Sequence, residues 1–277
     1  MNPAPVLFIS HGAPTFALEP GLLGPQLTAL GERLPDLAAV LVVSAHWQTR
    51  GTRVMGTAMP ATIHDFGGFP ASLYQLQYPA RGAPELAAEA MQFLRAAGFD
   101  ATLDAQRGLD HGAWVPLRFL FPRADVPVFQ VSMPQDLDTS GALRLGEALR
   151  PLRARGVMII GSGSLTHNLQ EFRPNARDEA AYAREFSGWI QQRVLERDAA
   201  ALEHYRERAP QAERAHPTED HFLPLLVAQG ASDPADVVSV IAGGIVHGAL
   251  SMDSYCWGMA PAPAAPHGAR PSTGELR

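Results

Sequence analysis

Four short apolar runs stand out along the chain, and each is continuous rather than alternating with polar residues. They cover residues 5–10 (PVLFIS), 39–44 (AVLVVS), 127–133 (PVFQVSM) and 157–161 (VMIIG). Continuous runs of this length are typical of strands in a sheet that is covered on both faces. Helical patterns separate them, at residues 21–34, 84–97, 141–155 and 178–197. Strands that alternate with helices predict an α/β fold, with a mostly parallel or mixed central sheet and helices on both of its faces.

The C-terminal part of the chain has a different pattern. Two further strands are expected at residues 237–242 and 249–256, and the glycines between them favour an antiparallel hairpin. Residues 259–277 are rich in Pro, Ala and Gly, which predicts a disordered tail. We therefore expect a single domain over residues 1–258, followed by a tail over residues 259–277.

Composition excludes several classes of protein. A length of 277 residues with 46% hydrophobic content is enough for one large core. The net charge of -6 and the lack of an arginine stripe interleaved with aromatic residues predict no binding to nucleic acid. The single cysteine, Cys256, excludes a disulfide framework within the chain and a cysteine-rich metal site. All 22 basic residues are arginine, so Schiff-base chemistry on a lysine is excluded as well.

The sequence carries no sign of export or of membrane insertion. The N-terminus lacks the basic start and the long apolar run of a signal peptide. No stretch approaches the roughly 20 apolar residues that cross a bilayer. We therefore expect a cytoplasmic protein that has no membrane partner.

The placement of the histidines predicts where a functional site lies. Three of the expected strands run into a turn of small residues and then reach a histidine, at His11, His46 and His167. Ligands of open α/β sheets bind beyond the carboxyl ends of the strands. If the three strands are parallel, these histidines share one edge of the sheet. A single histidine after a strand is more often an ordinary loop or core residue, but three in equivalent positions favour a site.

The other histidines do not share this position after a strand, and only some of them suit a functional site. Thr218 is expected to cap a helix whose first turn contains His221, and a helix N-terminus favours the neutral imidazole that a metal requires. His111 and His64 are expected in glycine-rich loops, each beside an aspartate that could orient its ring. The remaining histidines are interpreted as structural, solvated or part of the tail, namely His204, His216, His247 and His267.

This set of histidines predicts a metal site. Imidazole nitrogens suit Zn, Fe, Cu and Ni. The sequence has no H-E-x-x-H motif, so the common metalloprotease arrangement is absent. Open coordination positions on ferrous iron are the usual basis of non-haem oxygen chemistry.

Six motifs together resemble one known family. They are S-H-G-A-P, V-V-S-A-H-W, T-I-H-D-F-G-G-F-P, G-L-D-H-G-A-W, H-N-L and H-P-T-E-D-H-F-L-P-L-L. These motifs, in this order, resemble those of the class III extradiol ring-cleaving dioxygenases, specifically the branch that is similar to DOPA dioxygenase. The resemblance runs from about His11 to the strand near Ser251, and so covers nearly the whole chain apart from the tail.

The resemblance implies a single α/β domain that binds a non-haem metal. It makes His11, His46 and His221 the metal ligands, and His167 either a catalytic base or a fourth ligand. It places His111 as a catalytic residue that faces substrate or oxygen. Fe²⁺ would support activity, whereas three neutral histidines, in place of the carboxylate common in the wider class, make Zn²⁺ plausible in the isolated protein.

The expected reaction is the oxygen-dependent opening of a small aromatic diol, a catechol such as DOPA. Trp47, Phe66, Phe69 and Trp114 flank the motifs and are expected either to wall an aromatic pocket or to pack in the core. Two alternatives stay open, a zinc hydrolase that uses a metal-bound water and a non-catalytic metal-binding protein on the same fold. A structural metal site would not need His167 and His111, which favours the enzyme. Both a monomer and a small homo-oligomer are compatible with the sequence.

Overall fold

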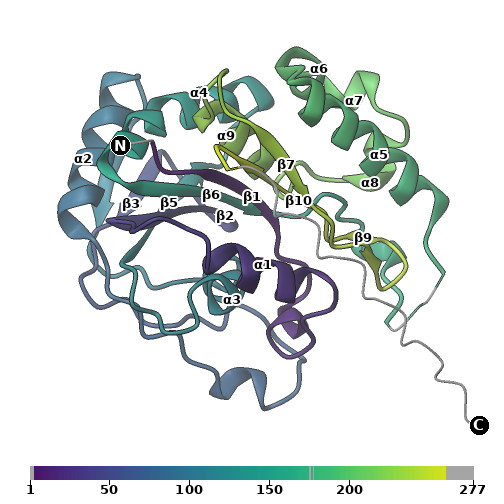
Figure 1. Cartoon of the computed structure of the whole chain (residues 1–277), viewed down its shortest axis with the longest axis horizontal. Helices are drawn as coiled ribbons and strands as arrows, with labels where there is room; N and C mark the ends of the chain where they lie inside the picture. The colour runs from purple at the N-terminus through teal and green to yellow at the C-terminus, as the bar shows by residue number, and fades with distance from the viewer. Residues whose placement is uncertain (1–2, 175, 177, 260–277) are drawn as a thin grey trace, which may run out of the picture.

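A mixed sheet forms the centre of the molecule. The structure is a computed structural model that describes residues 3–174, 176 and 178–259. Within these residues eight strands pair in the order β4-β3-β5-β2-β6-β1-β10-β7 (Figure 1). The strands are β1 (Val6–Ser10), β2 (Ala39–Thr49), β3 (Thr52–Met55), β4 (Ala101–Asp104), β5 (Val128–Pro134), β6 (Val157–Gly163), β7 (Val238–Ile241) and β10 (Ser254–Trp257).

The four strands predicted from continuous apolar runs occupy the middle of this sheet and run parallel. β6 pairs in parallel with β1 and with β2, and β2 pairs in parallel with β5. Antiparallel pairs join them to the flanks, where β3 meets β5 and β10 meets β1. The carboxyl ends of β1, β2 and β6 therefore meet at one edge, as the sequence predicts.

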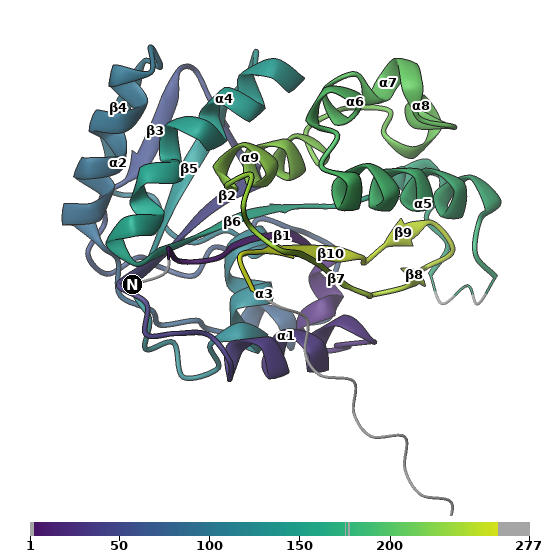
Figure 2. The same cartoon turned by 45° about the horizontal axis from the view of Figure 1, so that its top comes forward.

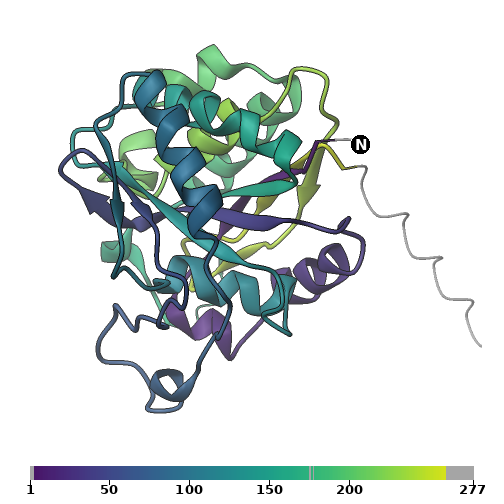
Figure 3. The same cartoon turned by 90° about the vertical axis from the view of Figure 1, so that its left-hand side faces the viewer.

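Helices cover both faces of the sheet, which explains why its central strands are buried throughout. One face carries α2 (Pro84–Ala96), α4 (Thr139–Leu149) and α9 (Leu223–Ala231), and the other carries α1 (Leu23–Gly31) and α3 (His111–Leu120) (Figures 1 and 2). Figure 3, seen from the side of α2, shows the two helical layers with the sheet between them. The predicted α/β architecture is confirmed.

A further group of helices packs beside the β7–β10 side of the sheet (Figure 2). Its members are α5 (Ala181–Glu196), α6 (Ala199–Glu203), α7 (Tyr205–Arg208) and α8 (Ala212–Ala215). Short 3-10 helices complete the structure, namely η1 (Pro14–Ala17), η2 (Leu73–Gln75), η3 (Arg150–Arg155) and η4 (Leu169–Glu171). The predicted helix over residues 141–155 is in fact α4 followed by η3, because Pro151 cannot donate the hydrogen bond that would continue an α-helix.

The predicted C-terminal hairpin forms, but it is interrupted in the middle. β7 and β10 pair antiparallel in the main sheet, whereas β8 (Ile245–Val246) and β9 (Leu250–Ser251) form a separate ribbon. At the break, the Asp253 carboxylate accepts hydrogen bonds from the backbone N–H groups of Gly243 and Gly244. The side chain of Asp253 thus takes the place of a neighbouring strand as the hydrogen-bond acceptor. The apolar pattern of the sequence does not predict this interruption.

Two strands of the main sheet, β3 and β4, were not predicted. Both have four residues, and the burial of β4 is mixed, so neither contains a continuous apolar run. The buried apolar side chains of the described residues form one core that spans β1 to β10. In the described part of the chain, no helix is long and apolar enough to cross a membrane. The predicted tail over residues 259–277 lies, apart from Met259, outside the described residues and stays a prediction.

Candidate functional site

Three histidines from distant parts of the chain converge at the carboxyl edge of the sheet. Nε2 of His46 lies 2.9 Å from Nε2 of His11 and 3.3 Å from Nε2 of His221. The three candidate ligand atoms lie within 4.8 Å of one another. A tetrahedral zinc site with bonds of about 2.0–2.1 Å separates its nitrogen ligands by about 3.3–3.4 Å. The spacing of these nitrogens therefore suits a single metal ion.

His46 does not follow its strand, as the sequence suggested, but lies inside it. β2 continues to Thr49, and its pairing with β5 changes register between Val43 and Gln48. Such an irregularity re-aims side chains. The apolar run ends at Ser44, so the sequence pattern placed the end of the strand too early.

The context of His221 also differs from the expectation. It lies in the turn before α9, not in the first turn of the helix, and Phe222 occupies the N-cap position without a side-chain cap. The Thr218 side chain instead helps to lower the pKa of the nearby Asp220 carboxyl. The predicted cap is therefore wrong, because α9 begins only at Leu223, beyond the reach of Thr218.

Close contact with β6 positions the backbone of His221. Its carbonyl oxygen accepts a hydrogen bond of 2.9 Å from the N–H of Ser164. A Cβ atom on the neighbouring Gly163 would lie only 2.2 Å from that oxygen. The glycine of the G-S-G-S segment therefore permits the approach that brings His221 to the other two histidines.

Hydrogen bonds leave Nε2 unprotonated on two of the three rings. Ser162 donates its hydroxyl hydrogen to the carbonyl of Gly112, so its Oγ accepts from Nδ1 of His11 at 2.9 Å. Nδ1 of His221 donates to the Asp220 carboxylate. Each ring then presents a free lone pair on Nε2, which is the form that binds a metal.

The electrostatics of the cluster keep its imidazoles neutral. Burial, reinforced by the neighbouring histidines, lowers the pKa of His11 well below its usual value. Burial also lowers the pKa of His221 to about 3, although the Asp220 carboxylate opposes this. The pKa of His46 falls to about 4 through burial and the nearby His111. At neutral pH, protons would therefore compete only weakly with a metal ion for these nitrogens.

His167 reaches the same edge of the sheet from β6, as predicted. Its ring stacks on that of His221, with centroids 3.5 Å apart and planes 7° from parallel. It groups with Asp220 and His221, and not with all three converging histidines. Burial lowers its pKa, and His111 adds to this effect while Asp220 opposes it.

His111 belongs to a helix, and not to a loop as the glycines around it suggested. It is the first residue of α3, whose N-cap Asp110 accepts a hydrogen bond from the N–H of Ala113. Its ring lies beside that of His46, with centroids 3.9 Å apart. The aspartate next to it in sequence does not orient its ring, because Nδ1 of His111 faces Oδ2 of Asp65 at 3.1 Å instead.

The other histidines of the described chain lie outside this cluster. His64 donates from Nε2 to the carbonyl of Leu76, so Asp65 does not orient it. His216 is buried and bonds the carbonyl of Leu165. His204 is exposed, and His247 sits in the β8–β9 turn against Phe172. His267 lies outside the described residues.

An apolar pocket of about 350 Å³ opens over the histidine cluster. Its described lining is Gly12, Ala13, Pro14, His46, Phe66, Phe69, His111, His167, Leu169, Phe172, His221 and Leu250. Phe66 and Phe69 thus wall the pocket, as one interpretation of the sequence expected. Trp47 and Trp114 are core residues, the first packed under the Arg107 guanidinium and the second bonded to the carbonyl of Ile63.

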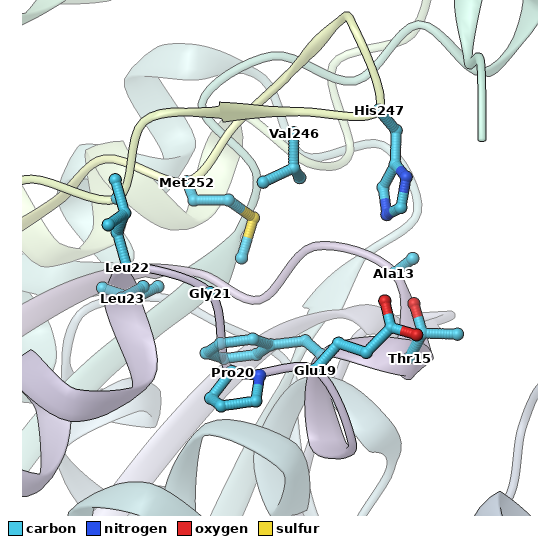
Figure 4. A pocket seen from close by; sticks show the side chains of 12 residues that line it. Ala13, Thr15, Glu19, Pro20, Gly21, Leu22, Leu23, Val246, His247 and Met252 are labelled. Atoms are coloured by element: carbon cyan, nitrogen blue, oxygen red, sulfur yellow. The ribbon is translucent and has the colours of Figure 1, made fainter. Parts of the chain in front are cut away.

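A second pocket, of about 210 Å³, lies next to the first and shares Ala13 with it. Figure 4 shows Met252 and Val246 pointing from the hairpin side toward the segment over residues 13–23. None of the three converging histidines lines this pocket. The chemistry of the site therefore belongs to the first pocket.

Comparison with known proteins assigns this arrangement to a family. Residues 23–248 match the family model described as the catalytic LigB subunit of aromatic ring-opening dioxygenase. The chain belongs to this family. A 4,5-DOPA dioxygenase extradiol from Beta vulgaris is 40% identical over 252 residues, which span 90% of this chain and 94% of that protein. One of the same name from Escherichia coli K12 is 37% identical, over 90% of this chain and 92% of its own length.

A solved structure agrees with this assignment. The crystal structure of an uncharacterized protein from Escherichia coli K12 superimposes with a TM-score of 0.76 and 30% identity, and covers 91% of this chain and 99% of that one. The resemblance stated from the six motifs is thereby confirmed, and with it the enzyme class, an aromatic ring-opening dioxygenase.

Several partners of the histidine cluster were not identified from the sequence. Ser162 gave no signal, because which side of β6 it faces depends on the register of the sheet. Asp65 was noticed only as a neighbour of His64, and Asp220 only as part of a helix turn. Phe172 lies three residues beyond the H-N-L motif and Leu250 lies far from the six motifs, and neither residue carries a motif of its own.

Proposed function

We propose that this protein is a metal-dependent extradiol dioxygenase that opens the ring of a catechol such as DOPA with O2. The observation that carries the proposal is the convergence of three Nε2 atoms beneath an apolar pocket that also contains His111 and His167. Membership of the family supports the reaction class. The names of the relatives from Beta vulgaris and Escherichia coli support the substrate class.

His11, His46 and His221 would hold the metal. Their Nε2 atoms are close enough to share one ion, and the partners on Nδ1 of His11 and His221 orient those rings. Bound Fe²⁺ would supply the redox chemistry through which O2 reacts with a catechol. Zn²⁺ fits three histidines equally well, so we expect the isolated protein to accept zinc without activity.

His167 is the residue we assign as general base. Its ring lines the pocket and its pKa is depressed by burial, so it is neutral at pH 7 and can accept a proton from a phenolic hydroxyl. The three converging histidines already suffice to hold an ion, which leaves His167 available for this task. Its assignment as a fourth ligand is the alternative that the tests below separate.

The pocket suits a single aromatic ring. Phe66, Phe69 and Phe172 offer apolar contacts, while the polar groups among the described lining residues are histidines and backbone. Most small-molecule sites combine an apolar lining with a few polar groups that fix the orientation of the ligand. Here the histidines would orient the two hydroxyls, with His111 on the side of His46 and His167 on the side of His221.

Oxygen uptake tests the proposal directly. The protein is stripped of metal, reconstituted with Fe²⁺ under anaerobic conditions and mixed with aerated DOPA or with simpler catechols. We expect one O2 consumed per catechol and a conjugated, ring-opened product. The mono-methylated catechols serve as controls and should not react, because they cannot bind through both hydroxyl oxygens.

Two results would contradict the proposal. Turnover of a substrate without oxygen consumption would favour the zinc hydrolase. A fully iron-loaded protein that converts no catechol of the panel would favour a non-catalytic metal-binding protein.

A further inference from the structure

We propose that Asp65 is a positioning residue whose carboxylate lies against Nδ1 of both His46 and His111 and favours, in each imidazole, the tautomer with a proton on Nδ1. Oδ2 of Asp65 lies 3.1 Å from Nδ1 of His111 and 3.8 Å from Nδ1 of His46. Oδ1 accepts a hydrogen bond of 2.9 Å from the backbone N–H of His111. One carboxylate therefore contacts a proposed metal ligand and a proposed catalytic residue together.

The geometry favours one tautomer because a carboxylate attracts a protonated ring nitrogen and repels a nitrogen lone pair. The proton of each ring is therefore favoured on Nδ1, the nitrogen nearest to Asp65, which leaves the lone pair on Nε2. For His46 this is the nitrogen that lies beside Nε2 of His11 and Nε2 of His221. For His111 it is the nitrogen away from Asp65, on a ring that lines the pocket.

The ionised state of Asp65 is maintained by the same contacts. The backbone N–H of His111 donates to this carboxylate and thereby stabilises its charged form. Its side chain is 22% exposed, against 6% for His111. The carboxylate thus sits at the rim of the site and is charged at neutral pH.

No other carboxylate in the described structure is placed to contact both His46 and His111 in this way. Asp110 precedes His111, but its two oxygens accept from the Ser44 hydroxyl, from the Gln130 amide and from Arg107. Asp220 contacts Nδ1 of His221 on the other side of the cluster. Asp65 reaches His111 across 46 residues of sequence, from the loop that also supplies Phe66 and Phe69 to the pocket.

The consequence for the reaction rests on the proposed function. With its proton on Nδ1, His111 presents Nε2 to the pocket as a hydrogen-bond acceptor, so it can hold a catechol hydroxyl or take its proton. Histidine ligands commonly depend on such carboxylate partners, whose loss typically costs about 10- to 100-fold in metal affinity or activity. Asp65 would couple the orientation of the substrate-binding histidine to that of the metal-binding one.

Nitrogen NMR of the histidine side chains tests the proposal without any turnover. The protein is labelled with 15N-histidine and loaded with Zn²⁺, which is diamagnetic, and the His111 signals are assigned by their loss in His111→Gln. The proton of His111 should reside on Nδ1 in the wild type. A proton on Nε2 of His111 in the wild type would overturn the proposal before any variant at position 65 is made.

Asp65→Asn separates positioning from a merely structural role. The amide can still accept from the backbone N–H of His111, but its NH2 group then faces Nδ1, and a donor cannot pair with a donor. We expect His111 to move its proton to Nε2 and kcat of the Fe²⁺-loaded enzyme to fall about 10- to 100-fold. Asp65→Glu retains the carboxylate and should return the Nδ1 proton and part of the activity.

Asp138→Asn is the matched control. Asp138 caps α4 by accepting a hydrogen bond from the N–H of Gly141, without contact to an imidazole in the described structure. It should change neither the tautomer nor kcat. Unchanged tautomers in folded Asp65→Asn would overturn the proposal, whether or not activity falls. A tautomer shift in a protein that oxidises no catechol would uphold it and count against the proposed function alone.

Discussion

The imidazole rings of His167 and His221 lie face to face, with centroids 3.5 Å apart and planes 7° from parallel. The stack is anchored at both ends by backbone hydrogen bonds, because the N–H of His167 donates to the carbonyl of Ala215 and the carbonyl of His221 accepts from Ser164. The proposed general base is thereby held against a proposed metal ligand without joining the three converging nitrogens.

His167→Gln separates the two assignments of this residue. Glutamine keeps a similar size and polarity but cannot act as a base, so turnover should fall by about 100- to 10,000-fold while metal content and catechol affinity are retained. Steady-state oxygen uptake and metal analysis measure both quantities. The exposed His204, replaced by Gln, is the control. Loss of metal from His167→Gln would make His167 a fourth ligand instead.

Metal binding should depend on His11, His46 and His221 together. A site with three protein ligands loses much of its affinity when one is removed, so each alanine variant should purify with strongly reduced metal yet remain folded. Elemental analysis and circular dichroism provide the readouts, with His204→Ala as the unaffected control. Retention of a full equivalent of metal by His46→Ala would remove that residue from the proposed ligands.

Gly163→Ala should disturb the site through the backbone. The added Cβ would lie 2.2 Å from the carbonyl oxygen of His221, so the turn that carries this histidine must shift. We expect a loss of about 1–3 kcal/mol in the free energy of unfolding, as for other overpacked positions, together with weaker metal binding. Thermal denaturation and metal titration measure the two effects.

Gly188→Ala is the matched control for this change. Gly188 lies in α5 with no heavy atom within 4 Å of the Cβ position, so alanine should raise stability by about 0.5–1 kcal/mol and leave metal binding unchanged. Equal behaviour of the two variants would show that the contact between β6 and His221 does not position the histidine.

Arg153 should affect stability without affecting chemistry. Its guanidinium donates to the carbonyl of Ala4, before β1, and contacts the Asp236 carboxylate at 2.8 Å, with 2% and 8% of the two side chains exposed. Arg153→Met leaves that carboxylate buried without its partner, which typically costs about 3–5 kcal/mol. Denaturant unfolding measures this loss, and kcat per folded molecule should stay unchanged.

Arg123→Met removes an arginine from an exposed pair with Asp125 and serves as the control. Solvent screens such pairs, so its unfolding midpoint should stay close to that of the wild type. A midpoint for Arg153→Met as high as that of Arg123→Met would show that the buried pair contributes nothing to stability.

Short-range patterns in the sequence were sufficient to predict the middle of the sheet. The continuous apolar runs correspond to β1, β2, β5 and β6, because a strand buried on both faces is apolar at most of its positions. The histidines that follow β1 and β6 reach one edge for an equally local reason, since parallel strands end on the same side. The edge strand β4 and its neighbour β3 escaped prediction, because short and partly exposed strands carry no such signal.

Only the tertiary structure decided how the histidines are held. Whether Asp65 or Asp110 orients His111 depends on which loop packs over α3, and both aspartates stand beside a histidine in the sequence. The position of His46 within β2 depends on a register shift against β5. The approach of His221 depends on a glycine in β6, 58 residues before it. The residue types therefore predict a metal site. Which ring nitrogen faces that site, which group orients each ring and how far apart the nitrogens lie depend on contacts between segments far apart in the chain.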